Sequence, residues 1–198
     1  ATLLKTQARS VQHMQKALGE MNLQLHKVLT DITGVTGMRI IRAILAGERN
    51  PAALAALRNY RVKSTEDEIA KALEGDYRTE HLFSLQQAVE LYDTYQQKIA
   101  ACDGRIEALL GSFEPRVKGE PCVPATPRKR RKNEPYFDLR GHLHRVTGVD
   151  FTQIKGLDTS TVQTLLSEVG LDPTRFPSEK HFCSWMGLCP DHRITGGK

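Results

Sequence analysis

The residues best suited to binding a charged partner form a run of five consecutive cations: Arg128, Lys129, Arg130, Arg131 and Lys132. Lysine and arginine side chains neutralise phosphates, so such a block in an extended spacer predicts contact with nucleic acid. The net charge of the chain is +5, which leaves the remaining residues formally neutral. A solvated basic segment without a ligand is the alternative.

Two glycine-bearing segments, residues 32–48 and 154–170, begin with the same four-residue pattern. The pattern is an apolar residue, any residue, glycine and a second apolar residue, and a helical pattern follows it. Both resemble the second half of a helix-hairpin-helix motif, in which backbone N–H groups at a helix start approach a phosphate without reading sequence. Lys155 and Gly156 are the candidates in the later segment, and Gly34 and Gly37 in the earlier one. An ordinary turn before a helix is the alternative for either segment.

Four side chains near the C-terminus could supply two nitrogen and two sulfur ligands to a tetrahedral zinc ion: His181, Cys183, Cys189 and His192. Their spacing matches no known zinc motif and includes no paired CxxC, so ordinary thiols are the favoured interpretation. The chain holds four cysteines, too sparse for a disulfide framework, and we expect them to be reduced. Neither a nucleophile elbow nor a Walker loop is present.

The composition is that of a soluble protein, with 39% hydrophobic and 6% aromatic residues among 198. So few aromatic residues disfavour a large β-sandwich. No apolar run approaches the roughly 18 residues that a membrane span needs, and no signal segment is seen. We therefore expect a cytoplasmic protein that does not enter a membrane. The chain starts without methionine and stops at a Gly-Gly turn, which predicts a piece of a longer protein.

The candidate binding residues must be positioned by helices, and two apolar stripes with alternating steps of three and four residues indicate where the long helices lie. The first, from Val11 to Ile32, predicts one long helix, and the second, from Leu85 to Phe113, predicts another. Between them, Asn50-Pro51 and a capping box at Thr65 each open a short helix. The prediction is a mainly all-α fold in which a long antiparallel hairpin or coiled coil (1–113) carries short helices near 38–75. The same stripes could instead join copies of the chain into a homo-oligomer.

The segment 114–135 holds five of the nine prolines together with the cationic block. It predicts a semi-stiff basic linker. Residues 136–198 then form a small helix-hairpin-helix-like unit, with one helix around 162–169 ended by Gly170 and another around 182–186 ended by Gly187. Its length makes its core marginal.

Three stretches carry a resemblance to a known family: residues 31–59, residues 79–103 and, above all, residues 156–198. The last contains SEVG, RFPS, WMGLCP and a Gly-Gly turn in that order. These stretches resemble the insertion-sequence one-ten family of bacterial transposases. The resemblance covers nearly the whole chain.

This resemblance implies a DNA recombinase with a Holliday-junction-resolvase-like acidic domain that binds a divalent metal such as Mg²⁺, a coiled-coil insert and a helical C-terminal domain. It also implies DNA and a structured guide RNA as partners. The chain would begin after the acidic domain, so we expect no cofactor in it and no recombination by it alone. The competing class is a non-enzymatic helical scaffold that dimerises.

The family places a nucleophilic serine before glycine in a turn that matches Ile194, Thr195, Gly196 and Gly197. Here the position is held by Thr195, whose extra methyl group restricts χ1. The resemblance also implies nucleic-acid contacts by Gly196, Gly197 and Lys198.

Overall fold

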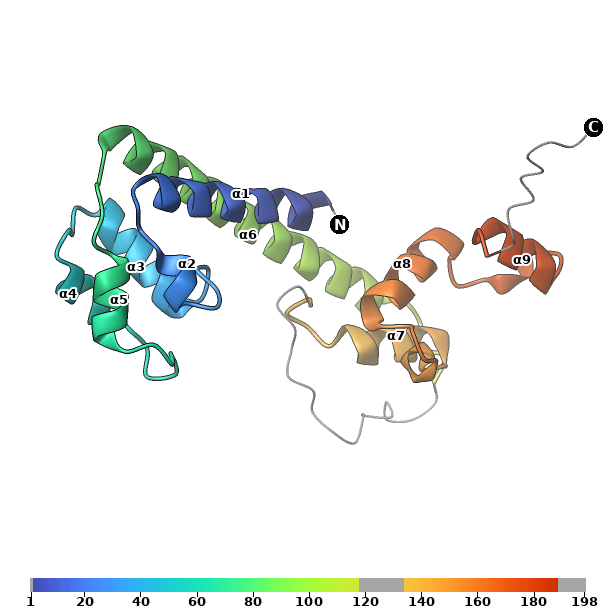
Figure 1. Ribbon diagram of the computed structural model, residues 1–198. Helices are drawn as coiled ribbons and strands as arrows, with labels where there is room; N and C mark the ends of the chain where they lie inside the picture. Colours follow the sequence, from blue (N-terminus) through green and yellow to red (C-terminus); the bar gives the residue numbers. More distant parts are fainter. Residues whose placement is uncertain (1, 118–133, 189–198) are drawn as a thin grey trace, which may run out of the picture. The chain divides into compact units, whose positions relative to one another are not determined.

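The computed structural model describes residues 2–117 and 134–188. These residues form nine α-helices, two short 3-10 helices and no β-strand (Figure 1), which confirms the expectation of a mainly α-helical fold. They divide into two compact units between Cys102 and Asp103, inside helix α6, and each unit is described by itself. The boundaries predicted at 113 and 135 stay predictions.

None of the described helices combines the length and the apolar character that crossing a bilayer requires.

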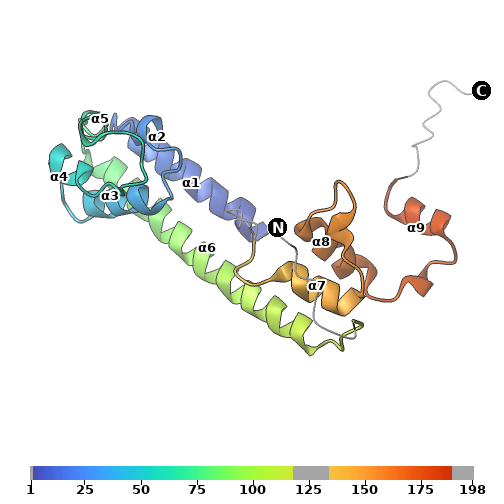
Figure 2. The same ribbon diagram turned by 90° about the horizontal axis from the view of Figure 1, so that it is seen from below.

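In the first unit, helix α1 (Thr2–Glu20) lies beside the N-terminal part of α6 (Thr79–Ser112) in both views (Figures 1 and 2). The two run antiparallel, since the end of α1 meets the start of α6, where His81 Nδ1 lies 3.1 Å from Glu20 Oε2. Apolar residues of both helices are buried in one cluster: Met14, Ala17, Leu18, Leu85, Ala88, Val89 and Tyr92.

The prediction of one long helix from Val11 to Ile32 was wrong, because α1 ends at Glu20. Asn22 adopts a left-handed conformation with φ +59°. Just after it, the Gln24 N–H donates to the Ala72 carbonyl at 2.8 Å. This bond to a residue about fifty positions later replaces a bond within the helix. The apolar spacing predicted which side chains face the core, but tertiary contacts determine where the helix ends.

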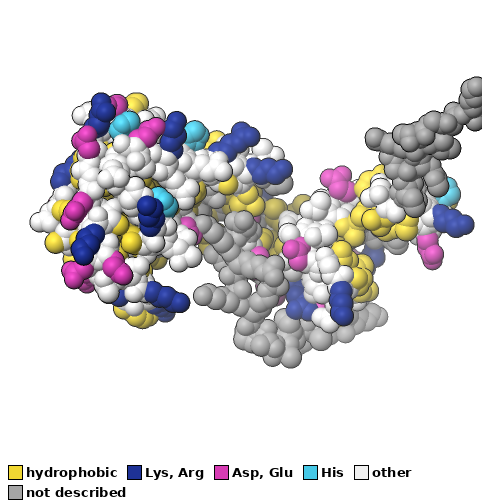
Figure 3. Space-filling model, in the orientation of Figure 1, with side chains coloured by type: hydrophobic (Ala, Val, Ile, Leu, Met, Phe, Trp, Pro, Cys, Tyr) yellow, Lys and Arg dark blue, Asp and Glu magenta, His cyan; other side chains and the backbone are white. Residues whose placement is uncertain are grey.

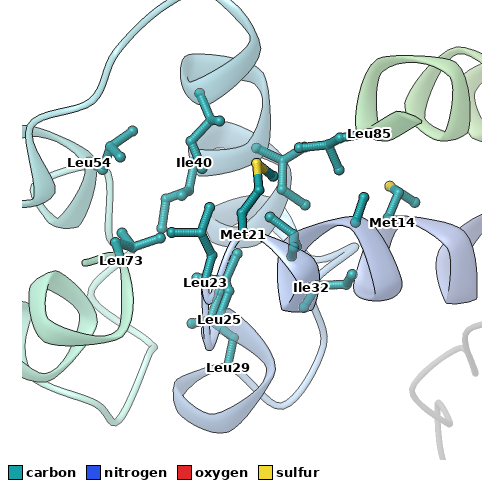
Figure 4. Packing of buried hydrophobic residues seen from close by; sticks show 14 of the residues in the cluster. Met14, Met21, Leu23, Leu25, Leu29, Ile32, Ile40, Leu54, Leu73 and Leu85 are labelled. Atoms are coloured by element: carbon teal, nitrogen blue, oxygen red, sulfur yellow. The ribbon is translucent and has the colours of Figure 1, made fainter. Parts of the chain in front are cut away.

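Four short helices lie between α1 and α6: α2 (Leu25–Val28), α3 (Val35–Leu45), α4 (Pro51–Ala55) and α5 (Glu66–Ala72). The insertion therefore begins earlier than the predicted residue 38. The predicted helix starts are confirmed. Asn50 accepts from the Ala52 and Ala53 N–H groups, and both bonds of the capping box form between Thr65 and Glu68. Figure 4 shows side chains of these helices converging on those of α1 and α6 in a single core.

The second unit carries helices α7 (Leu139–Thr147), α8 (Thr159–Val169) and α9 (Glu179–Trp185). The two predicted glycine stops are confirmed, with Gly170 after α8 and Gly187 following α9, both at positive φ. Its described core is small. Leu139, Leu143 and Val162 are buried, and the partly buried residues packed against them are Leu110, Phe137, Phe151, Leu157 and Leu166. This core holds the connection between α7 and α8.

Candidate nucleic-acid interface

Apart from the earlier glycine segment and the considered zinc set, the structure describes two of the predicted site residues, Lys155 and Gly156, in the connection between α7 and α8. The others lie outside the described residues, and their roles stay predictions: Arg128, Lys129, Arg130, Arg131, Lys132, Thr195, Gly196, Gly197 and Lys198.

Lys155 and Gly156 occupy the middle of a four-residue turn. The Leu157 N–H donates to the Ile154 carbonyl at 3.1 Å, and Gly156 has φ +94°. Lys155 keeps a negative φ, so the turn is type II, which requires positive φ at its third position. A Cβ atom on Gly156 would meet nothing within 4 Å. Glycine is therefore needed for the backbone conformation, and the space beside it is open to a ligand.

Asp150 connects α7 to the 3-10 helix Phe151–Gln153, which comes just before this turn. Its carboxylate accepts from Arg140 Nε of α7 at 3.2 Å, from the Thr152 N–H at 3.1 Å and from Gln153 Nε2 at 3.1 Å. The Arg140 guanidinium is the main cause that keeps the pKa of Asp150 well below its ordinary value. Asp150 was not among the predicted site residues. The Asp-x-Thr spacing, which favours an Asx turn, was the available signal.

The start of α8 already carries a negative group. Asp158 Oδ1 accepts from the Thr161 N–H and from the hydroxyl groups of Ser160 and Thr161, each at 2.8 Å. A phosphate at this helix end would face the Asp158 carboxylate, which repels it. Phosphate contact in this region is therefore expected at the Lys155 side of the turn and not at the helix start.

A groove of about 520 Å³ beside the turn is lined by residues 134–140, 152–153 and 157–159. Its charged lining residues are Glu134, Asp138, Asp158 and Arg140. Since Arg140 is paired with Asp150, the lining is predominantly acidic.

The described part of the second unit, residues 103–117 and 134–188, carries seven Lys and Arg residues against ten Asp and Glu. Several arginines bind the protein itself. Arg145 donates to the Phe113 carbonyl at 3.0 Å, and Arg116 donates to the Leu171 carbonyl at 3.0 Å. The described part of this unit therefore carries more negative than positive charge.

The earlier glycine segment does not repeat the turn. Gly34 has φ −70° at the N-cap of α3, where its N–H donates to the Asp31 carbonyl. Gly37 lies inside α3 and is buried. A Cβ atom on Gly37 would lie 2.1 Å from the Ile32 carbonyl oxygen, so glycine is needed there for close packing. The phosphate interpretation of this segment therefore has no support from its geometry.

Two members of the considered zinc set are described: His181 and Cys183, both in α9. Cys189 and His192 lie outside the described residues. Across residues 2–117 and 134–188, no three His, Cys, Asp or Glu side chains gather as a metal site. The Mg²⁺ that the resemblance implies would belong to the acidic domain, so this finding does not bear on it.

Residues 150–198 match the family model described as "Transposase IS116/IS110/IS902 family". The match starts at Asp150 and includes the Lys155–Gly156 turn and helix α8. No curated protein and no solved structure matches the chain.

Proposed function

Because residues 150–198 match the C-terminal region of an insertion-sequence transposase, we propose that this chain is a nucleic-acid-binding part of such an enzyme. Its ligands are DNA and the structured guide RNA. The observation that carries the proposal is the type II turn at Lys155 and Gly156, which lies inside the matched region and opens to solvent.

The turn presents a lysine ammonium group beside a glycine, which has no side chain to block access to the backbone. Lys155 and Gly156 are both exposed, so a phosphate can approach the backbone as well as the side chain. Contacts of this kind position a duplex without reading its bases. Since the described part of the second unit is acidic, we assign most of the attraction to Arg128, Lys129, Arg130, Arg131 and Lys132.

A salt titration tests this proposal. Affinities for a 20-base-pair duplex are measured by fluorescence anisotropy at several salt concentrations for the parent and for a variant with glutamine at all five positions of the block. Loss of up to five phosphate contacts should lower the slope of log affinity against log salt by about four, at roughly 0.9 per contact. An unchanged slope would show that the block does not touch phosphate.

Lys155→Gln tests the turn separately, with Lys180→Gln as its control, because Lys180 is also an exposed lysine of the second unit but belongs to α9. The Lys155 variant should weaken binding to unrelated duplex sequences alike and lower the slope by about one. The Lys180 variant should bind as the parent does. Equal effects of both changes would remove the turn from the interface.

A second role, self-association, is favoured by the later part of α6. Tyr92 is the last residue of this helix in the buried cluster, yet the apolar spacing continues. Ile99 and Ile106 are half-buried, and Leu109 is 58% exposed. An apolar stripe that is only partly covered on a long helix is typical of a surface that pairs with another helix. We propose that this stripe joins two copies of the chain.

A further inference from the structure

The first unit contains a groove of about 730 Å³ that sequence analysis did not predict. It lies between two loops and the start of α3, and its walls are residues 26–31, 34–36 and 59–64. Gly34 of the earlier glycine segment lines the groove, but none of its residues belongs to the Lys155–Gly156 turn or to the block at 128–132.

The groove is positively charged. Lys27, Arg61 and Lys63 line it, all three are exposed, and none forms an ion pair with a carboxylate of the described residues. The carboxylate in the lining belongs to Asp31, which accepts from the Thr33 N–H at 2.9 Å and from its hydroxyl group at 2.7 Å. On the face of the first unit seen in Figure 3, cations are interspersed with carboxylates.

The aromatic ring of Tyr60 also lines this groove. Tyr60 is 79% exposed, so burial of its ring contributes little to folding. The Arg61 guanidinium lies 5.3 Å from the ring centroid, and its Nε donates to the Tyr60 hydroxyl at 2.9 Å. This pair keeps a flat apolar face and a positive charge side by side. Such a pairing is what stacks and neutralises an unpaired nucleotide.

The walls are held by hydrogen bonds between segments that are far apart in the sequence. The Ser64 hydroxyl donates to the Val28 carbonyl at 2.7 Å, and the Asn59 N–H donates to the Thr36 hydroxyl at 3.0 Å. The loop 59–64 is therefore fixed to both α2 and α3. A groove formed before its ligand arrives binds at a lower entropic cost.

We propose that this groove binds a single-stranded polynucleotide, with phosphates on Lys27, Arg61 and Lys63 and one base stacked on Tyr60. A base exposes its face for stacking only when it is unpaired, which favours a single strand over a duplex. Single-stranded RNA and single-stranded DNA share this chemistry. The inference shares with the proposed function only the class of ligand, since it concerns a different unit and different residues.

The test uses the full chain with fluorescent 20-nucleotide oligo(U) and oligo(dT) and a 20-base-pair duplex. The groove variant is Lys27→Gln with Arg61→Gln and Lys63→Gln. Its matched control is Lys5→Gln with Arg9→Gln and Lys98→Gln, which removes the same charge from exposed positions of α1 and α6. Both sets of substitutions are also made in the chain whose basic block is neutralised. Loss of binding at the groove is then distinguishable from loss of binding at the basic block.

The groove variant should weaken binding of a single strand at least tenfold and lower its salt slope by about two, at roughly 0.7 per phosphate contact. The control set should change affinity less than threefold. Tyr60→Leu should weaken binding about tenfold, whereas Tyr60→Phe should bind within twofold of the parent, because the ring and not the hydroxyl stacks.

Stronger loss with oligo(U) than with oligo(dT) would assign the groove to RNA, and the reverse would assign it to DNA. Equal losses for both would support a groove that accepts either strand. Equal losses for the groove and control sets would overturn the proposal, as would an equal effect of the groove variant on the duplex. Circular dichroism of each variant confirms that the helices persist.

Discussion

Asp150 should stabilise the connection between α7 and α8, and Asp150→Asn tests this. The asparagine keeps an acceptor for the Thr152 N–H but loses the charge that binds Arg140. Hydrogen bonds to charged groups contribute about 1.5 to 3 kcal/mol. The Arg140 and Asp150 side chains are 28% and 20% exposed, so solvent screening places the loss near the lower value, about 1.5 kcal/mol.

Hydrogen exchange of peptides from α7 and α8 in the full chain measures this change locally. A loss of about 1.5 kcal/mol corresponds to about tenfold faster exchange at neutral pH, where exchange follows the opening equilibrium. Asp172→Asn is the control. Asp172 also accepts from the backbone and hydroxyl of a following threonine, Thr174, but has no arginine hydrogen bond among the described contacts. Its replacement should change exchange less than threefold.

The effect should depend on pH in a direction set by the lowered pKa of Asp150. A carboxyl group whose folded pKa lies below its unfolded value, about 3.9, stabilises the fold fully above that value. This contribution is lost as the pH falls toward the folded pKa. The difference between parent and Asp150→Asn should therefore be full above about pH 5 and shrink below pH 4. A difference that is absent at pH 7, or unchanged at pH 3, refutes the reasoning.

Four further substitutions test the first unit and α6. Gly37→Ala should destabilise the first unit by about 3 kcal/mol in denaturant unfolding, because the added Cβ would overlap the Ile32 backbone. Gly19→Ala should instead stabilise α1 by about 0.5 to 1 kcal/mol, because a Cβ there would meet nothing within 4 Å. Ile99→Asp should halve the mass measured by light scattering if α6 joins two copies, and should lower only the melting temperature if the stripe packs within one chain. Thr65→Ala should cost about 1 kcal/mol by removing the cap of α5, and an unchanged melting temperature would contradict that.

Local signals in the sequence predicted local structure well. The capping box at Thr65, the Asn50-Pro51 start and the glycine stops after α8 and α9 are all found, because each depends on residues within a few positions. The end of α1 was missed because it depends on Ala72, whose carbonyl binds the Gln24 N–H. No pattern around residue 20 contains that information.

In the candidate site, too, local features were predictable from the sequence and long-range features were not. Gly156 was identified from a short pattern, and its positive φ fits a turn that precedes a helix. The charge opposing phosphate at the start of α8 comes from Asp158, an N-cap residue that the glycine pattern does not include. The groove around Tyr60 was not predictable from spacing, since its walls come from segments about thirty residues apart in the sequence.

The hydrogen bonds that end α1 have a consequence for synthesis on the ribosome. Gln24 and Met21 pair with Ala72 and Asp76, which are translated about fifty residues later. Until those residues emerge, the nascent chain has only its own apolar spacing, which favours a continuous helix through Ile32. We expect this nascent helix to be longer than α1 and to unwind past Glu20 when the α5 region arrives, so that closure of a loop of about fifty residues limits the folding of the first unit.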